Sequence, residues 1–466
     1  MYCKIYFIFI FLLAGIKVQA QEEGYINYSL EECIAYALEH NANLLNAQLD
    51  RKIAQKKVNE TIADGLPQLN GNVDLGYNFK VRTTPIPDFI SPAVYAVLQQ
   101  ESLVQNPPTE FGLIPVQFGT KYTGSATLSL EQMIFNGSYF VGLQAARTFT
   151  ELSRKDQIKT KIDVIEAVSK AYYSTLVLEE RKKLVVTNYQ RLDSLLRDTR
   201  IMHENGFAEK IDVSRIQVQF NNIKVEKENF DKSLMISKAL LKFQMGMPQE
   251  TVLNLSDQIS DINFEKIENS LGNDFTYEQR IEYAQLQTNK DLVELDIKNT
   301  RVKYYPRIDM YGTLGSTTGV QSSDEFFNFN DNWFGIGVVG LRMNLPIFDG
   351  FRKSNIIQQK KIQAEQIDNS FEQLKHNIDL EIKRASVQYE RSIDNMVAQK
   401  ENMQLAKEVY HVTKIKYEEG VGSNIEVTNA DADYKEAQTN YYNALYEALI
   451  AKVELEKAYG RLLENQ

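Results

Sequence analysis

The stretch of sequence that decides the fold runs from Pro346 to Gly422, beginning PIFDGFRKSN and ending IKYEEGVG. Between Phe351 and Glu419 it holds 69 residues without a proline or a glycine. Apolar residues recur there at steps of three and four, as at Phe371, Leu374 and Ile378, which is the periodicity of an α-helix. With a rise of about 1.5 Å per residue, this helix would be roughly 100 Å long. A globular domain has no room for such a helix, so the pattern predicts coiled-coil packing against other helices.

The same stretch occurs twice in the chain. The segment LSLEQMIFNG at 128–137 aligns with LRMNLPIFDG at 341–350. From Gly137 to Gly206 is 69 positions and from Gly350 to Gly420 is 70, and a further glycine closes each copy 40 positions later. Five residues past Gly206 and Gly420, IDVS in one copy matches IEVT in the other. So many shared spacings indicate a tandem duplication.

The pattern of apolar residues predicts the same order of elements in both halves. Each half has a helix, a strand, a loop, a second strand, a long helix and a shorter helix. We expect a signal peptide at 1–20, the first repeat at 21–246, a connector at 247–275 and the second repeat at 276–466. Residues 82–121 are rich in proline and lack periodicity, which predicts a long exposed loop.

Two shorter helices of the first half have equal predicted lengths. Ser29-Leu-Glu-Glu32 is a capping box, and it predicts a helix that extends to Asp64. The other runs from about Lys210 to Met245. Each spans 36 residues, so end to end they match the reach of one long helix.

The N-terminus has the features of a secretory signal peptide: Lys4, an apolar run from Ile5 to Ile16, and the small-residue site Val18-Gln19-Ala20. Removal of two lysines with it moves the formal net charge from −10 to −12, which disfavours nucleic acid as a partner. Cys33 then remains as the only thiol, so no intrachain disulfide is expected. These features fit an exported bacterial protein.

Four segments alternate apolar and polar residues with a period of two. They are expected at 69–79, 122–133, 308–314 and 334–347, the last two joined by a loop rich in Gly, Ser, Thr and Asn. One apolar and one amide-rich face suit a strand between lipid and water, although a half-buried strand of a soluble sheet has the same pattern. No apolar run of 18 residues follows the signal, so a membrane location would require a β-barrel.

Aromatic residues near the strand ends are candidates for an interfacial girdle, with plain packing as the alternative for each. They are Tyr77, Phe79, Tyr122, Trp333 and Phe334.

No constellation for catalysis is evident. The four histidines fall in separate predicted helices without cysteine or acid at metal-ligand spacing. The sequence has no glycine-rich phosphate loop, nucleophile elbow or H-E-x-x-H motif. We therefore expect no enzyme, no cofactor and no metal site.

The ordered set of motifs resembles the TolC family of outer-membrane efflux proteins over nearly all of the mature chain. The residues that carry the resemblance are SLEECIAYAL at 29–38, Leu66-Pro67, Tyr305-Pro306, LPIFDG at 345–350 and the two glycine turns. The resemblance implies a homotrimer in the outer membrane of a Gram-negative bacterium. Four strands per chain would build one shared barrel of twelve, continued by a coiled-coil tunnel of long helices across the periplasm.

The resemblance also implies a gate near the periplasmic tip. Asp212 and Glu426, just after the two turns, are the gate candidates, because acids at this tip in the family form a ring that constricts the tunnel. An acid in the first turn of a helix also has a structural reason, its favourable interaction with the helix dipole. Asn429, one turn after Glu426, stands where a further acid could have followed.

Glycines and prolines mark the remaining candidate positions. The turns at Gly206, Gly420 and Gly422 are candidates for contact with a periplasmic adaptor protein, although tight helix-to-helix turns favour glycine in any case. The residues that lead into and out of the strands are Pro67, Pro306, Pro346, Gly137 and Gly350.

The sequence thus predicts a passive exit duct for a tripartite efflux or type I secretion system. Its partners would be two further copies of the chain, a periplasmic adaptor, an inner-membrane transporter and outer-membrane lipid. The alternative is a secreted or periplasmic coiled-coil structural protein without a pore. The cargo and the role of residues 82–121 are not evident from the sequence.

Overall fold

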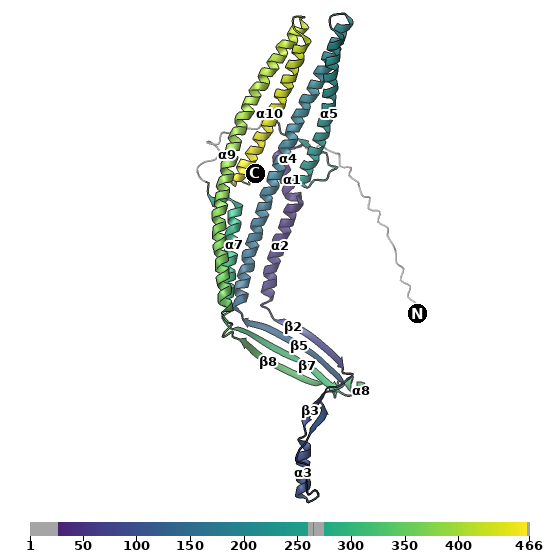
Figure 1. The fold of residues 1–466 in the computed structure, drawn as a ribbon, viewed down its shortest axis with the longest axis vertical. Helices are drawn as coiled ribbons and strands as arrows, with labels where there is room; N and C mark the ends of the chain where they lie inside the picture. Colours follow the sequence, from purple (N-terminus) through teal and green to yellow (C-terminus); the bar gives the residue numbers. More distant parts are fainter. Residues whose placement is uncertain (1–26, 260–263, 265–274, 464–466) are drawn as a thin grey trace, which may run out of the picture. The chain divides into compact units, whose positions relative to one another are not determined.

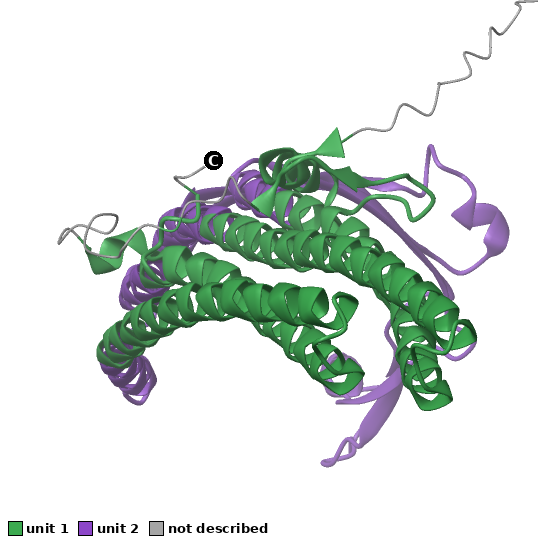
Figure 2. Cartoon of the chain, turned by 90° about the horizontal axis from the view of Figure 1, so that it is seen from above, with its two compact units in different colours: residues 1–49, 155–284, 372–466 green, residues 50–154, 285–371 purple. Residues whose placement is uncertain are grey.

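The computed structural model describes residues 27–259, 264 and 275–463. The predicted signal peptide and most of the predicted connector lie outside them. Figure 1 shows the elements and Figure 2 the two compact units of the chain. Unit 1 comprises residues 1–49, 155–284 and 372–466, and unit 2 comprises residues 50–154 and 285–371. Each unit takes segments from both halves of the sequence, so the predicted repeat boundaries stay a prediction.

The helices and strands follow the predicted order along the chain, except that the first helix is split and several short elements are additional. Their bounds are β1 Asn27–Tyr28, α1 Leu30–His40, α2 Ala42–Ala63, β2 Gln68–Tyr77, β3 Thr83–Pro87, α3 Ile90–Gln100, β4 Leu113–Gln117, β5 Tyr122–Phe135, α4 Gly137–Glu204, α5 Lys210–Met245, β6 Asn254–Leu255, a 3-10 turn Tyr277–Gln279, α7 Ile281–Val302, β7 Arg307–Val320, α8 Ser323–Phe326, β8 Phe334–Asn344, α9 Arg352–Glu418 and α10 Asn424–Ala458. None of the described helices combines the length and apolar character needed to cross a membrane.

The sheet of unit 2 has four antiparallel strands in the order β2-β5-β7-β8. The register places Leu128 of β5 opposite Leu314 of β7, and Ser129 opposite Thr313. Because successive side chains of a strand point to opposite faces, one face of the sheet is apolar and the other is polar over most of its area. At the two ends of the order, β2 and β8 each have one free edge among the described residues.

Strand β8 departs from this alternation. The pairing of Leu314 with Gly337 places the neighbouring residues Ile336 and Val338 on the polar face. Leu341 and Met343, on the other pleat, lie on the apolar face, so β8 carries apolar residues on both sides, while Arg342 and Asn344 keep the end of its polar face polar.

Residues 82–121 are not the loop without regular structure that the sequence predicts. Strands β3 and β4 pair antiparallel, with Thr83 opposite Gln117 and Pro87 opposite Leu113, and helix α3 lies between them. Both strands contain prolines. Because proline is tolerated in strands mainly at edges, these prolines make the sequence of the two strands look like that of a loop.

The first predicted helix is broken into α1 and α2 at Asn41. Its side-chain oxygen accepts from the backbone N–H of Asn43 at 2.9 Å and of Leu44 at 3.3 Å. Its side-chain nitrogen donates to the carbonyl of Gln244 at 2.7 Å. The asparagine therefore starts a new helix and also joins it to the end of α5.

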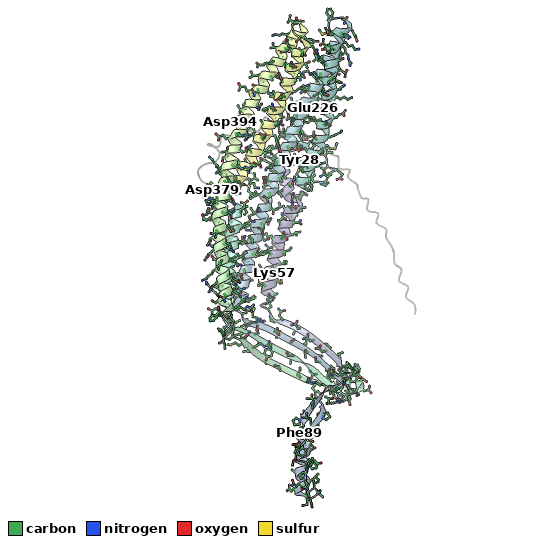
Figure 3. The ribbon with its side chains drawn as sticks, in the orientation of Figure 1. Tyr28, Lys57, Phe89, Glu226, Asp379 and Asp394 are labelled. Carbon is green, nitrogen blue, oxygen red and sulfur yellow. The ribbon has the colours of Figure 1, made fainter. Side chains whose placement is uncertain are left out.

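The core of unit 1 lies between α1, α4, α5 and α10. Among its largest fully buried side chains are Tyr172, Ile165, Leu241 and Leu449. A second cluster joins all four long helical segments of the unit, with Leu192 from α4, Ile216 from α5, Tyr410 from α9 and Val427 from α10. Figure 3 shows the side chains along these helices, with Glu226 of α5 and Asp394 of α9 among those labelled.

Candidate functional site

Two tight turns join the helices of unit 1 in pairs, α4 to α5 and α9 to α10. Gly206 has φ 83° and Gly420 has φ 77°, a left-handed conformation that favours glycine. In each turn the following residue donates its backbone N–H to the carbonyl five positions back, at 2.8 Å and 2.9 Å, as in a Schellman motif. These following residues are Phe207 and Val421, and they are 82% and 79% exposed. Both turns therefore present an apolar side chain at the same end of the helices (Figure 1).

Asp212 and Glu426 occupy the same position in the helices that follow the turns. Each is the third helical residue and closes a capping box. The carboxylate of Asp212 accepts from the backbone N–H of Glu209 at 3.2 Å, and that of Glu426 accepts from Ser423 N–H at 3.5 Å. Arg215 lies 3.6 Å from Asp212. Both acids therefore stabilise a helix start, whatever further role they have.

A charged pair inside unit 1 connects the two helical hairpins. Arg191 on α4 donates from Nη2 to Oδ1 of Asp431 on α10 at 2.5 Å. The other carboxylate oxygen of Asp431 lies 2.9 Å from Nζ of Lys435. The side chain of Asp431 is only 3% exposed, and the Arg191 guanidinium is stacked 4.5 Å from the ring centre of Tyr410 on α9. This pair therefore connects three helices of the unit.

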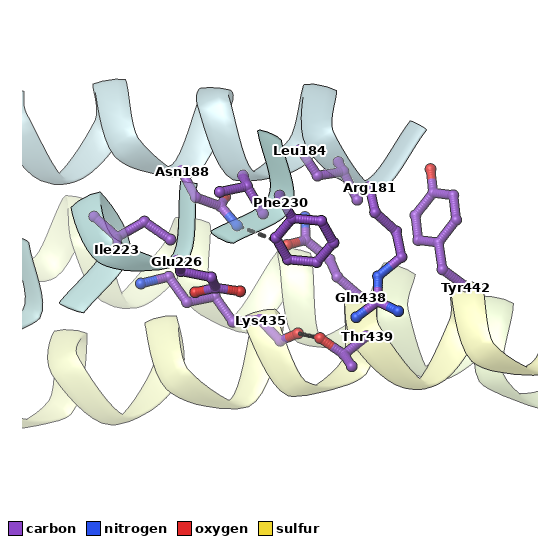
Figure 4. A pocket seen from close by; sticks show the side chains of 11 residues that line it. Arg181, Leu184, Asn188, Ile223, Glu226, Phe230, Lys435, Gln438, Thr439 and Tyr442 are labelled. Carbon is purple, nitrogen blue, oxygen red and sulfur yellow. Dashed lines mark hydrogen bonds between the residues drawn. The ribbon is translucent and has the colours of Figure 1, made fainter. Parts of the chain in front are cut away.

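The surroundings of the pair are partly apolar. Burial raises the pKa of Tyr410 to about 12, and the nearby Arg191 charge opposes that shift. Further along, Asn188 of α4 donates to Gln438 of α10 at 3.0 Å (Figure 4). Arg181 covers the ring of Phe230 at 5.1 Å, and burial lowers the pKa of its guanidinium. The interface between the hairpins therefore alternates apolar layers with polar contacts.

The other candidate positions lie in unit 2, at the ends of its strands. Pro67 and Pro306 come directly before β2 and β7, and Pro346 follows the end of β8. Gly137 is the first residue of α4, and a Cβ there would meet the Cβ of Val302 at 2.9 Å. Gly350 has φ 65°, and Phe351 after it has φ 63°, a conformation that non-glycine residues rarely adopt.

The sequence did not predict the pairing of Arg191 with Asp431. The residues are 240 positions apart, and each stands in a helix with many other charges. An acid on the buried face of α10, among apolar residues at helical spacing, was the available signal.

Residues 33–247 and 278–461 match the sequence profile of the outer membrane efflux protein family. The chain belongs to that family. The outer membrane protein TolC of Vibrio cholerae is 20% identical over 439 residues, which cover 94% of this chain and 92% of TolC. The alkaline protease secretion protein AprF of Pseudomonas aeruginosa is 20% identical over 346 residues, which cover 73% of this chain and 70% of AprF.

Solved structures of outer membrane channels have a similar fold. The open state of the MtrE outer membrane channel of Neisseria gonorrhoeae matches with a TM-score of 0.70 at 16% identity, over 92% of this chain and 88% of that one. These findings confirm the family that the motifs predicted, the outer-membrane location that goes with it, and a mainly helical fold with a strand portion. The roles of Asp212, Glu426 and the other candidate residues stay predictions.

Proposed function

We propose that this outer membrane efflux protein is the exit duct of a tripartite efflux or type I secretion system. Three copies join their sheets into one barrel of twelve strands, and their long helices form a tunnel across the periplasm. An inner-membrane transporter, reached through a periplasmic adaptor, supplies energy and selects the cargo. The duct itself is passive and carries out no covalent chemistry.

The observation that carries this proposal is the four-stranded sheet of unit 2. It has one apolar face, one mostly polar face and two free edges. A sheet with an apolar face against lipid and two free edges needs a further strand at each edge, because unpaired backbone N–H and C=O groups in lipid cost free energy. Copies of the same chain provide both edges at once, since β8 of one can pair with β2 of the next.

An aromatic cluster lies at the end of the sheet where β2 ends and β5 begins. It supports the assignment of the apolar face of the sheet to lipid. The rings of Tyr77 and Tyr122 are 5.0 Å apart, and Tyr122 lies 5.9 Å from Phe326. Trp333 packs 5.8 Å from Phe326 and donates its ring N–H to the Phe326 carbonyl at 2.9 Å. Tyrosine and tryptophan with a satisfied polar group are typical of a membrane–water interface.

The rival function, a coiled-coil structural protein without a pore, accounts for the helices but not for the sheet. Such a protein needs no strands with an apolar outer face. It also needs no pair of them between the helices of each half.

The gate of the proposed duct lies where α5 and α10 start. Two acids, Asp212 and Glu426, from each of three copies would bring six carboxylates around one axis. Their repulsion opposes closure, so a closed tip requires restraints between helices. The Arg191–Asp431 pair is such a restraint, because it joins the first hairpin of a copy to the second.

The adaptor contact of the proposed duct is placed at the two turns. Phe207 and Val421 are exposed at equivalent positions there, which supports this placement. Exposed apolar residues on a polar rim are typical of protein contact sites.

The proposal is tested by the native mass of the protein after detergent extraction of isolated outer membranes. A trimer that needs detergent and forms channels in a planar bilayer is the expected result. A chain that is soluble without detergent, or is extracted as a monomer, would refute the shared barrel and the duct with it.

A further inference from the structure

Helix α3 carries an apolar stripe that has no partner within the described residues of its unit. The stripe consists of Ile90, Ala93, Val94 and Val97, which helical spacing places on one side of the helix. Ile90 is 53% exposed, Val94 is 49% exposed and Val97 is 60% exposed. From Phe89, labelled in Figure 3, to Gln100 the chain has no charged residue.

The rest of α3 is fixed to its own hairpin. The carboxylate of Asp88 accepts from the backbone N–H groups of Ile90 at 3.1 Å and Ser91 at 2.8 Å, which holds the start of the helix. Tyr95 packs against Phe111 with ring centres 5.8 Å apart. The α3 stripe faces away from this contact, since Tyr95 lies about 100–140° around the helix from Ile90 and Val94.

The hairpin that carries α3 is a continuation of two strands of the sheet. β3 follows β2 after a short connection, and β4 precedes β5 in the same way. The backbone N–H of Asn78 donates to the carbonyl of Lys121 at 2.7 Å and closes the link between the two connections. The α3 stripe is therefore attached to β2, a strand with a free edge.

We propose that the α3 stripe is a contact between copies of this chain, where the helices of a trimer pack together over the outer mouth of the duct. The inference rests on the proposed function, because copies joined from β8 of one to β2 of the next place their three α3 hairpins at the same rim of one barrel. Steps of three and four residues between the stripe positions suit packing of helix against helix. The stripes are uncharged, so like copies meet without repulsion.

Cysteine cross-linking in isolated outer membranes tests this contact. The natural chain is a suitable background, because Cys33 is fully buried and Cys3 lies in the predicted signal peptide. Val94→Cys is expected to give covalent dimers on mild oxidation, since one disulfide can join only two of three copies. A maleimide reagent with three arms should convert these to covalent trimers. Gln99→Cys, on the opposite side of α3, is the matched control and should stay monomeric on denaturing gels.

The outcomes separate this inference from the proposed function. A trimer by native mass in which Val94→Cys gives no dimer, or no more dimer than Gln99→Cys, overturns the contact and leaves the duct intact. The same holds if Val94→Cys reacts instead with a maleimide carried on a lipid of the outer leaflet. A chain that is not a trimer without cross-linking overturns the duct itself.

Excision of α3 gives a second measurement that does not depend on cysteine. Asp88 N–H already donates to the Gly112 carbonyl at 3.1 Å, so a short Gly-Ser segment can replace residues 89–111 while β3 and β4 stay paired. We expect a trimer with at least twofold higher single-channel conductance than the natural chain when the tip is held open by the same gate variant in both. Equal conductance would contradict packing of α3 over the mouth.

Discussion

Arg191 of α4 donates to Asp431 of α10 across the interface between the two helical hairpins, and 3% of the Asp431 side chain is exposed. Removing one partner of a buried pair leaves the other charge without compensation. We expect Asp431→Asn to destabilise the helical tip by up to about 3–5 kcal/mol and to raise single-channel conductance at low voltage. Asp433→Asn, an exposed acid of the same helix, should change neither quantity. Unchanged conductance in Asp431→Asn would mean that the pair does not restrain a gate.

The charges of the two gate candidates, Asp212 and Glu426, can be removed while their hydrogen bonds in the capping boxes are largely kept. Asp212→Asn with Glu426→Gln leaves a side-chain oxygen for each capping box. Loss of a cap costs about 0.3–1.5 kcal/mol, so we expect the free energy of unfolding to change by less than that. Cation selectivity, measured as reversal potential in a planar bilayer under a salt gradient, should fall. The control is Glu228→Gln with Glu436→Gln, which removes the same charge from exposed sites further from the turns. Equal selectivity in the two variants would place the gate elsewhere.

Gly206 in the first turn and Gly142 inside α4 differ mainly in backbone conformation. A Cβ at Gly206 or at Gly142 meets no atom within 4 Å, but only Gly206 has positive φ, at 83°. Gly206→Ala should therefore destabilise the protein by about 1–2 kcal/mol, whereas Gly142→Ala should stabilise it by roughly 0.5–1 kcal/mol. Thermal unfolding in detergent measures both. A similar shift in both variants would contradict a conformational origin.

Trp333 is the only tryptophan, so its fluorescence reports on the aromatic cluster alone. A Cβ added at Gly124 would meet Trp333 at 2.8 Å and Phe326 at 3.0 Å. Gly124→Ala is therefore expected to shift the emission to longer wavelength, and brominated lipids should quench Trp333 less in this variant. Gly112→Ala, where a Cβ meets no atom within 4 Å, should leave both signals unchanged. Absence of quenching in the natural chain would contradict a lipid-facing cluster.

A network of charged side chains around Glu166 in unit 1 should make the stability of the fold depend on pH in the acid range. Burial raises the pKa of Glu166, but hydrogen bonds from Lys457 at 2.6 Å and Lys170 at 2.9 Å outweigh this effect and lower it. A carboxylate with a lowered pKa stabilises the fold above its unfolded value of 4.5, and that contribution is lost as pH falls through the folded value. Glu166→Gln should therefore flatten the fall of thermal stability below about pH 4.5. Asp198→Asn, an exposed acid of α4, should keep the natural pH profile.

The sequence predicted best those elements that have local signals at both ends. The bounds of α5, Lys210 and Met245, agree with the prediction because a turn glycine precedes the helix and Gly246 ends it. Strand β7 is longer than predicted, because its outer part, from Gly315 to Val320, has the glycine, serine and threonine content of a loop. Pro85 and Pro115, which face each other in β3 and β4, gave the signal of an irregular segment.

The candidate site was predicted only where its signal was local. Asp212 and Glu426 follow glycine turns, and that spacing is visible in the sequence. The partner of Asp431 is not visible in the sequence, because packing over the whole unit decides which faces of the helices meet. The apolar residues on both sides of β8 likewise became evident only from its register with β7.

The free edges of β2 and β8 have a consequence for biogenesis. A single copy crossing the periplasm exposes two rows of unpaired backbone groups beside an apolar face, which is a template for pairing with any extended chain. Assembly of the proposed trimer must therefore be faster than misassociation, and we expect its yield to fall when newly exported chains accumulate. In the proposed duct the unassembled monomer is therefore the species most exposed to misassociation.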